Sequence, residues 1–372
     1  EAPSMVINKL VDPGEVYVIG QYELGTNNPT GLYKIGIVQN ERSTYHRLPE
    51  HQTGNPNRLF ISECIPAEAS YLVEQQMHRK WNSKRVSQEW FDLSAPGDYA
   101  QVVADIHAME GQFGPQITQL RDVYYLAPTV GNNTTLSATD LRLAQQLRDQ
   151  AFDLLDQMAR LKYKFSTLEC QIKLTNGQDA CVDSMSTVKI TNPFTEFSKS
   201  KLPSALRQAY MNKPRKRSQD FRYIYTQTGS EIDSLKIDSA FWKNRYPAEF
   251  THFNAAKTAW KAMEPSITIA SVNRVVQPRT SALETMHAEY VDAIIAYGDL
   301  KLQKEGLEIQ TKILCNRYQG IEDVCSWERK EQSVEFNLPA FKVLEPAAYA
   351  DPAHQVPKGD TAKPEDIKFK TW

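Results

Sequence analysis

Short runs in which apolar and polar residues alternate occupy the first 94 residues, and Gly-, Asn- and Pro-rich stretches separate them. Alternation with a period of two is typical of strands with one buried face, and the polar stretches predict turns. The runs predict strands at residues 16–21, 32–38 and 58–65. Because a long polar loop at residues 23–31 joins the first two strands, we expect them to pair in an antiparallel manner.

A helical period follows these strands at residues 67–81, where apolar residues recur every four positions. A closing helix is predicted at residues 99–109, before a Gly-, Pro- and Asn-rich stretch. The sequence therefore predicts a small α+β domain over residues 1–110, with a three-stranded antiparallel sheet and helices. A linker is expected over residues 111–136.

Two long segments in the rest of the chain carry apolar residues at alternating steps of three and four, the heptad pattern of packed helices. They begin near Ser137, which forms a capping-box-like start with Asp140, and near Ser281. Each helix would be roughly 50 Å long at about 1.5 Å per residue. We predict that both pack together in a mainly α body over residues 137–347, with coiled-coil-like helices and β-hairpins. The same seams could also join two copies of the chain as a homodimer.

The two long segments also begin an internal repeat. Residues 168–173 resemble residues 307–312, and similar loops follow each of them. The sequence therefore indicates two copies of a helix followed by a hairpin, at residues 137–200 and 281–340. Prolines among charged residues predict an extended tail over residues 348–372.

Composition narrows the class of protein. The chain has 372 residues, of which 41% are hydrophobic and 24% charged, as in folded proteins. Its 43 basic and 45 acidic residues give a net charge of −2, which excludes a uniformly basic nucleic-acid coat but leaves local patches open. No apolar stretch is long enough for a membrane helix and no export signal is visible, so we expect a cytoplasmic protein with no membrane contact. Five scattered cysteines argue for reduced thiols and against structural zinc.

One local patch is strongly basic, within an insert at residues 199–225. Eight basic residues lie between Lys199 and Arg222, against one acid, Asp220. The aromatic residues Phe221, Tyr223 and Tyr225 could stack on bases. The insert therefore predicts contact with DNA. The basic residues chosen for this contact are Lys213, Arg215, Lys216, Arg217 and Arg222.

A series of motifs along the first 94 residues suggests a chemical activity. In order, they are Val16-Tyr17-Val18, Tyr33-Lys34-Ile35-Gly36, Arg47, Gln52-Thr53-Gly54-Asn55-Pro56, a helix with Glu74 and His78, and Glu89-Trp90-Phe91. This ordered set resembles the GIY-YIG nuclease superfamily, in the phage-associated branch with the Tyr-Lys-Ile-Gly motif. The resemblance covers a little over one fifth of the chain.

The resemblance implies that Tyr17 and Tyr33 lie side by side and face the scissile phosphate. It implies that Arg47 holds this phosphate, although Arg42 competes because the interval before Arg47 is long. Glu74 would be the sole protein ligand of Mg²⁺, or of Mn²⁺ in its place. A lone carboxylate suits Mg²⁺, which keeps most of its waters.

Other side chains could assist. One tyrosine would act as general base or orient the attacking water, and a pKa near 10 means that it needs help from the cation and from Lys34 or Arg47. Lys34 is also expected to contact DNA. His78 lies four residues after Glu74, on the same helix face, and could contact substrate or Glu74. His46 and His51 are interpreted as loop histidines.

The leading hypothesis is a metal-dependent DNA endonuclease, encoded by a phage or mobile element, whose helical body engages DNA. The alternative is a catalytically idle nucleic-acid-binding or scaffold protein, since most of the chain shows no chemistry. Convergence of Tyr17, Tyr33, Arg47 and Glu74 on one concave face would favour the enzyme.

Overall fold

The computed structural model describes most of the chain. The described residues are 9–39, 42–125, 133–176, 186–189, 194–215, 219–227, 230–264, 279–329, 333–358 and 366–369. Within these residues, no helix combines the length and the apolar character needed to cross a membrane.

The N-terminal part is built on a five-stranded antiparallel sheet with the order β3-β1-β2-β5-β4. Its strands are β1 (Gly14–Tyr22), β2 (Pro29–Gln39), β3 (Leu59–Ala67), β4 (Arg85–Ser87) and β5 (Trp90–Asp92). The three predicted strands are present, and the antiparallel pairing of the first two is confirmed. The prediction of a three-stranded sheet was wrong, because β5 pairs with β2 and β4 pairs with β5. Strands of three residues carry too little alternation to be predicted.

Helices cover both faces of this sheet: α1 packs on one face, and α2 and α3 on the other. They are α1 (Thr44–Gln52), α2 (Ser70–Lys80), η1 (Asn82–Lys84) and α3 (Asp98–Tyr125). No helix was predicted at the position of α1. The predicted end of α3 at residue 109 was wrong, since the helix continues through Pro115. A helical proline clashes with the carbonyl four residues earlier, here that of Gly111, and the buried Ile117 and Leu120 anchor the following turns in the core.

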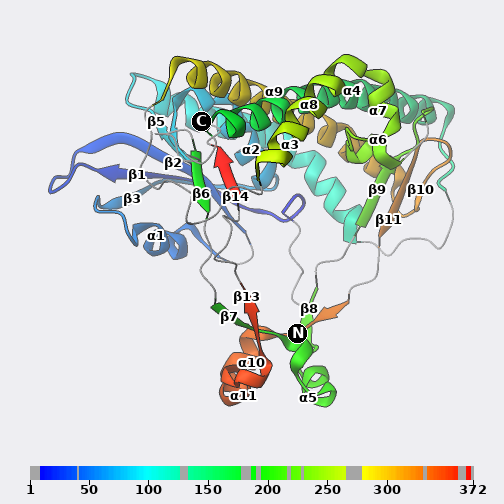
Figure 1. Cartoon of the computed structure of the whole chain (residues 1–372). Coiled ribbons are helices and arrows are strands. Elements are labelled where there is room, and N and C mark those ends of the chain that lie inside the picture. The colour runs from blue at the N-terminus through cyan, green and yellow to red at the C-terminus, as the bar shows by residue number, and fades with distance from the viewer. Residues whose placement is uncertain are drawn as a thin grey trace.

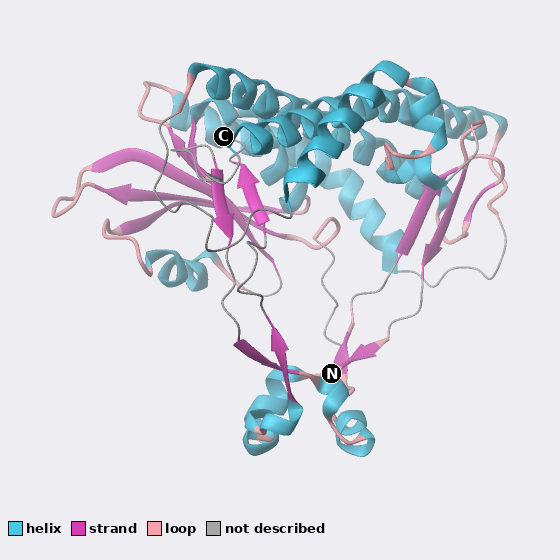
Figure 2. Ribbon diagram, in the orientation of Figure 1, coloured by secondary structure: helices cyan, strands magenta, loops and turns pink. Residues whose placement is uncertain are grey.

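Three long helices form a layer beside the sheet (Figures 1 and 2). They are α4 (Ala138–Asn176), α8 (Pro247–Met263) and α9 (Ser281–Cys315), with the short helices α6 (Ser230–Ser234) and α7 (Ala240–Arg245) nearby. The two long helices predicted from the heptad pattern are thus present and pack together. Leu168 and Ile172 of α4 contact Leu283 and Tyr290 of α9, so the two helices run antiparallel. One apolar cluster extends from Val16 in β1 to the body, and the sheet and body share a core.

Small sheets complete the body. The strands are β6 (Ser186–Lys189), β7 (Phe194–Phe197), β8 (Lys213–Pro214), β9 (Gln219–Tyr223), β10 (Gly320–Ile321), β11 (Cys325–Arg329), β12 (Val334–Glu335), β13 (Gln355–Lys358) and β14 (Asp366–Phe369). The prediction of an extended tail was wrong, because β13 pairs with β7 and β14 pairs with β6. These partners lie more than 150 residues away, and such pairing leaves no local signal.

The strand pairing is reciprocal between the two halves of the body. Residues 220–223 of β9 read Asp-Phe-Arg-Tyr and pair with β11, while residues 366–369 of β14 read Asp-Ile-Lys-Phe and pair with β6. In the same way, Thr195 of β7 lies opposite Pro357 of β13, and Val334 of β12 opposite Pro214 of β8. If the body holds two copies of one repeat, β9 is the last strand of the first copy and β14 the last strand of the second. Each of them pairs with a strand of the other copy, β9 with β11 and β14 with β6. The internal repeat stays a prediction, with this pattern in its favour.

A small lobe lies away from the helical layer (Figure 1). It contains β7, β8, β12 and β13 with α5 (Ser204–Ala209), α10 (Leu338–Leu344), α11 (Pro346–Ala350), η2 (Lys199–Lys201) and η4 (Pro352–His354). Leu202, Phe336 and Phe341 form its buried centre. Both halves of the body therefore contribute to one apolar core.

Arg329 of β11 joins α3 to the end of α9. Its guanidinium donates to the carbonyls of Val123, Asn316 and Tyr318 at 2.8–3.0 Å, and only 3% of the residue is exposed. We expect Arg329→Ala to lower the free energy of unfolding by about 2–3 kcal/mol, because buried carbonyls lose their donors. Urea denaturation followed by circular dichroism measures this. Arg222→Ala, at an exposed arginine of β9, should change the midpoint little, and equal midpoints for both variants would contradict the prediction.

Candidate functional site

A cavity of about 540 Å³ lies where β2 extends beyond its pairing with β5. β1, β2, α1 and α2 all contribute to its walls. Its lining residues are Lys9, Tyr17, Ile37, Val38, Gln39, Arg42, Arg47, Tyr71, Glu74, Gln75 and Glu89. Three of the four residues that were expected to converge, Tyr17, Arg47 and Glu74, therefore meet in one concavity.

Tyr17 lies in β1 with 1% of its surface exposed, opposite Gly36 of β2. A Cβ atom at Gly36 would lie 2.4 Å from the Tyr17 hydroxyl, so the glycine of the Tyr-Lys-Ile-Gly motif leaves space for this ring. Burial, and next the carboxylate of Glu89, raise the pKa of Tyr17 above its ordinary value, and Arg47 only partly offsets them. Tyr17 is therefore a neutral phenol at pH 7.

His51, in the last turn of α1, lies beside this phenol. Its Nε2 is 3.0 Å from the Tyr17 hydroxyl oxygen. Burial, and next the positive charges of Lys34 and Arg47, lower the pKa of His51, so a neutral imidazole is favoured at pH 7. A neutral Nε2 can accept the proton of Tyr17. The interpretation of His51 as a loop histidine was wrong, and the spacing of Arg47, Glu50 and His51 at i, i+3 and i+4 was the helical signal that could have revealed it.

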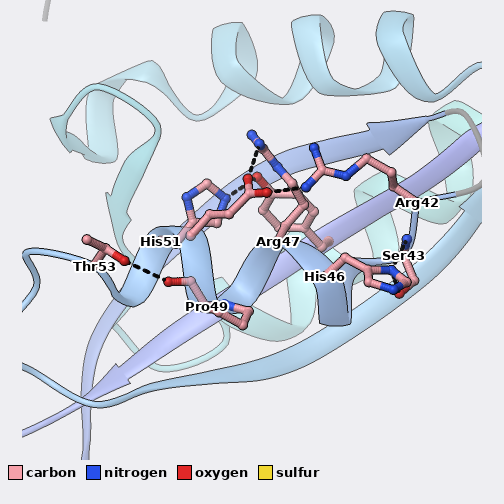
Figure 3. A network of polar contacts seen from close by, with 9 residues as sticks. Arg42, Ser43, His46, Arg47, Pro49, His51 and Thr53 are labelled. Carbon is pink, nitrogen blue, oxygen red and sulfur yellow. Dashed lines mark hydrogen bonds and ion pairs between the residues drawn. The ribbon is translucent and has the colours of Figure 1, made fainter. Parts of the chain in front are cut away.

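His46 has a local structural role. Its Nδ1 accepts a hydrogen bond from the backbone N–H of Ser43 at 3.2 Å, at the N-terminus of α1 (Figure 3). It also lies in α1, so its interpretation as a loop histidine was wrong too. His46 is not among the residues that line the cavity.

Tyr33 is not in the cavity, and the expectation that it lies beside Tyr17 was wrong. It pairs with Gly20, three residues from Tyr17, and side chains alternate between faces along a strand. Its ring packs on the opposite face, 5.0 Å from the ring of Tyr99 and 6.3 Å from that of Phe60. Tyr33 is a packing residue.

Lys34 takes the place that was expected for Tyr33. It lies opposite Ile19 of β1, on the same face as Tyr17, and its ammonium pairs with Glu89. Burial tends to raise the pKa of Glu89, but the hydrogen bond and charge of Lys34 outweigh it and hold the pKa below its usual value. Lys34 was expected to contact DNA, and no role was predicted for Glu89. The structure brings this ion pair to the edge of the cavity.

Glu74 of α2 has few protein partners. It is half-buried, and within the described part of the chain its carboxylate receives one long hydrogen bond, 3.5 Å from Gln75. Burial, and next the charge of Glu89, raise the pKa of Glu74 to about 7. An under-partnered carboxylate beside an open cavity fits a hydrated Mg²⁺ ion, which needs only one or two protein oxygens. Among the described residues, no group of three or more His, Cys, Asp and Glu side chains could hold a metal.

His78 does not line the cavity. Its Nε2 donates to the carbonyl oxygen of Ile35 at 2.8 Å, and its ring lies 5.5 Å from that of Phe91. Although His78 and Glu74 are one turn apart, His78 is turned toward β2 and ties α2 to the sheet. Its expected contact with substrate or Glu74 is not supported.

The predicted DNA contacts of the body lie apart from the cavity. Lys213 and Arg215 are exposed and pair with Glu335, and Arg222 pairs with Asp220. Lys216 and Arg217 lie outside the described residues. The expectation that the neighbouring aromatic residues are free to stack on bases was wrong for Tyr223 and Tyr225, which are 5% and 9% exposed and belong to the core. Figure 1 shows β9 at the far end of the helical layer from the N-terminal sheet.

The fold and the cavity define a small α+β domain that gathers a phenol, a histidine, an arginine and a weakly partnered carboxylate. Residues 14–109, about a quarter of the chain, match the T5orf172 domain. This domain is associated with phages and, in general, with nuclease activity. No curated protein and no solved structure matches the chain.

Proposed function

We propose that this protein is a metal-dependent DNA endonuclease of the GIY-YIG type, encoded by a phage or mobile element. The cavity in the N-terminal domain would hydrolyse phosphodiester bonds, and the helical body would hold the DNA. The observation that carries the proposal is the meeting of Tyr17, Arg47 and Glu74 from β1, α1 and α2 in one cavity, with His51 in hydrogen-bond contact with the Tyr17 hydroxyl. The T5orf172 match over the same residues supports it.

The side chains can supply the parts of such a reaction. A water molecule beside Tyr17 would pass its proton to the phenol oxygen as the phenol proton moves to Nε2 of His51, so that Tyr17 stays neutral throughout. Arg47 would hold the non-bridging oxygens of the phosphate, as guanidinium groups do. Glu74 would hold Mg²⁺ or Mn²⁺, which when bound neutralises charge that develops on the phosphate.

The body would supply most of the affinity for DNA. The exposed basic residues Lys213, Arg215 and Arg222, together with Lys216 and Arg217, are the proposed phosphate contacts. Some of these charges are already paired with acids, so DNA would have to compete with Glu335 and Asp220. Affinity of this kind falls steeply with salt.

Cleavage of supercoiled plasmid tests the proposal directly. We expect nicked or linear DNA with Mg²⁺ or Mn²⁺ and intact DNA with EDTA, as measured on agarose gels. Salt-sensitive DNA binding without cleavage in the presence of any metal ion would overturn the proposal of an endonuclease. It would favour the alternative, an idle nucleic-acid-binding or scaffold protein.

A further inference from the structure

Glu50 of α1 contacts both arginines of the cavity, Arg42 in the loop before α1 and Arg47 in α1 itself. Oε2 of Glu50 accepts a hydrogen bond from Nη1 of Arg47 at 2.6 Å, and Oε1 accepts one from Nη2 of Arg42. Figure 3 shows the guanidinium groups of Arg42 and Arg47 reaching the same place above α1. The two arginines, which compete for one role in the sequence, are joined in one network.

Glu50 holds this network from outside the cavity. Arg42 and Arg47 line the cavity with Tyr17, whereas Glu50 is not among the lining residues. A guanidinium has five N–H donors, and the contact with one carboxylate oxygen leaves most of them available. The remaining donors of both arginines can therefore serve an anion in the cavity while Glu50 keeps its contacts.

The alternative arrangement, without Glu50, would be unfavourable for catalysis. Arg42 and Arg47 have exposed fractions of 47% and 33% in their side chains, and two cations that approach each other repel. Long exposed side chains also lose rotamer entropy when a ligand orders them. A carboxylate between the two guanidinium groups reduces both costs before substrate arrives.

We propose that Glu50 is a positioning residue that holds Arg42 and Arg47 as a pair, so that both bind the oxygens of one phosphodiester. The inference rests on the proposed nuclease function and adds two residues to it. It predicts that removal of the Glu50 charge harms catalysis, although loss of a negative charge near DNA would by itself tighten binding.

Steady-state cleavage of a short duplex with Mg²⁺ tests the proposal. We expect Glu50→Gln to lower kcat about 10-fold and raise KM about 3-fold, because misplaced phosphate contacts mainly cost rate. In the Arg42→Ala/Arg47→Ala background, Glu50→Gln should add no further loss, since residues that act through one another are not additive. Glu23→Gln, in the β1–β2 loop, is the matched control and should match the unmodified protein.

Three outcomes would overturn the positioning role. The first is an unchanged kcat in Glu50→Gln. The second is a lower KM and a higher kcat in Glu50→Gln, which would mean that Glu50 competes with phosphate for the arginines. The third is a loss of kcat from Glu50→Gln in the Arg42→Ala/Arg47→Ala protein that equals its loss in the unmodified protein. Binding of the same duplex in EDTA separates this inference from the proposed function. If the unmodified protein does not cleave DNA, the nuclease proposal fails. The arginine pair would still be supported if Glu50→Gln binds the duplex more weakly in EDTA and this weakening disappears in the Arg42→Ala/Arg47→Ala protein.

Discussion

Glu74→Gln should reduce Mg²⁺-dependent DNA cleavage by about 10³-fold or more, because the cavity then lacks the weakly partnered carboxylate that would hold the cation. The substitution keeps the size of the side chain and removes its negative charge. Burial, and next the charge of Glu89, raise the pKa of this carboxyl group to about 7, so the charge is unfavourable in the folded protein. We therefore expect the folded state to be as stable as before. The measurements are the single-turnover cleavage rate at saturating Mg²⁺ and the melting temperature of both proteins.

Glu68→Gln provides a matched control for Glu74→Gln. Glu68 precedes the same helix and pairs with Arg121 of α3, outside the cavity. Its variant should cleave DNA at close to the unmodified rate. Undiminished cleavage by Glu74→Gln, with its fold intact, would refute the assignment of Glu74 as the metal ligand.

The parts of this fold that sequence could predict are those with long, local periodicity. The strands β1, β2 and β3 and the helices α4 and α9 repeat their apolar residues over enough positions to be recognised. The short strand β5 and the strands β13 and β14 depend on partners elsewhere in the chain. Their pairing depends on tertiary structure, so no local sequence pattern predicts it.

The candidate site was predictable to the extent that motif order places residues in one region. Motif order brought Tyr17, Arg47 and Glu74 together, but it did not specify which residue of the Tyr-Lys-Ile-Gly motif in β2 lies on the same face as Tyr17. A shift of one position along a strand moves a side chain to the other face, and this separates Tyr33 from Lys34. The register of β1 against β2, with Tyr17 opposite Gly36, supplies the missing information.

A comparison of the two tyrosines tests this face assignment. We expect Tyr17→Phe to lower the single-turnover cleavage rate about 10²- to 10³-fold, because the water would lose its proton path to His51. Tyr33→Phe should change the rate less than about 3-fold, since the ring of Tyr33 packs on the opposite face against Tyr99. Both variants remove one hydroxyl and keep the ring, so loss of packing cannot explain a difference between them. Equal losses would show that the cavity around Tyr17 is not where the reaction occurs.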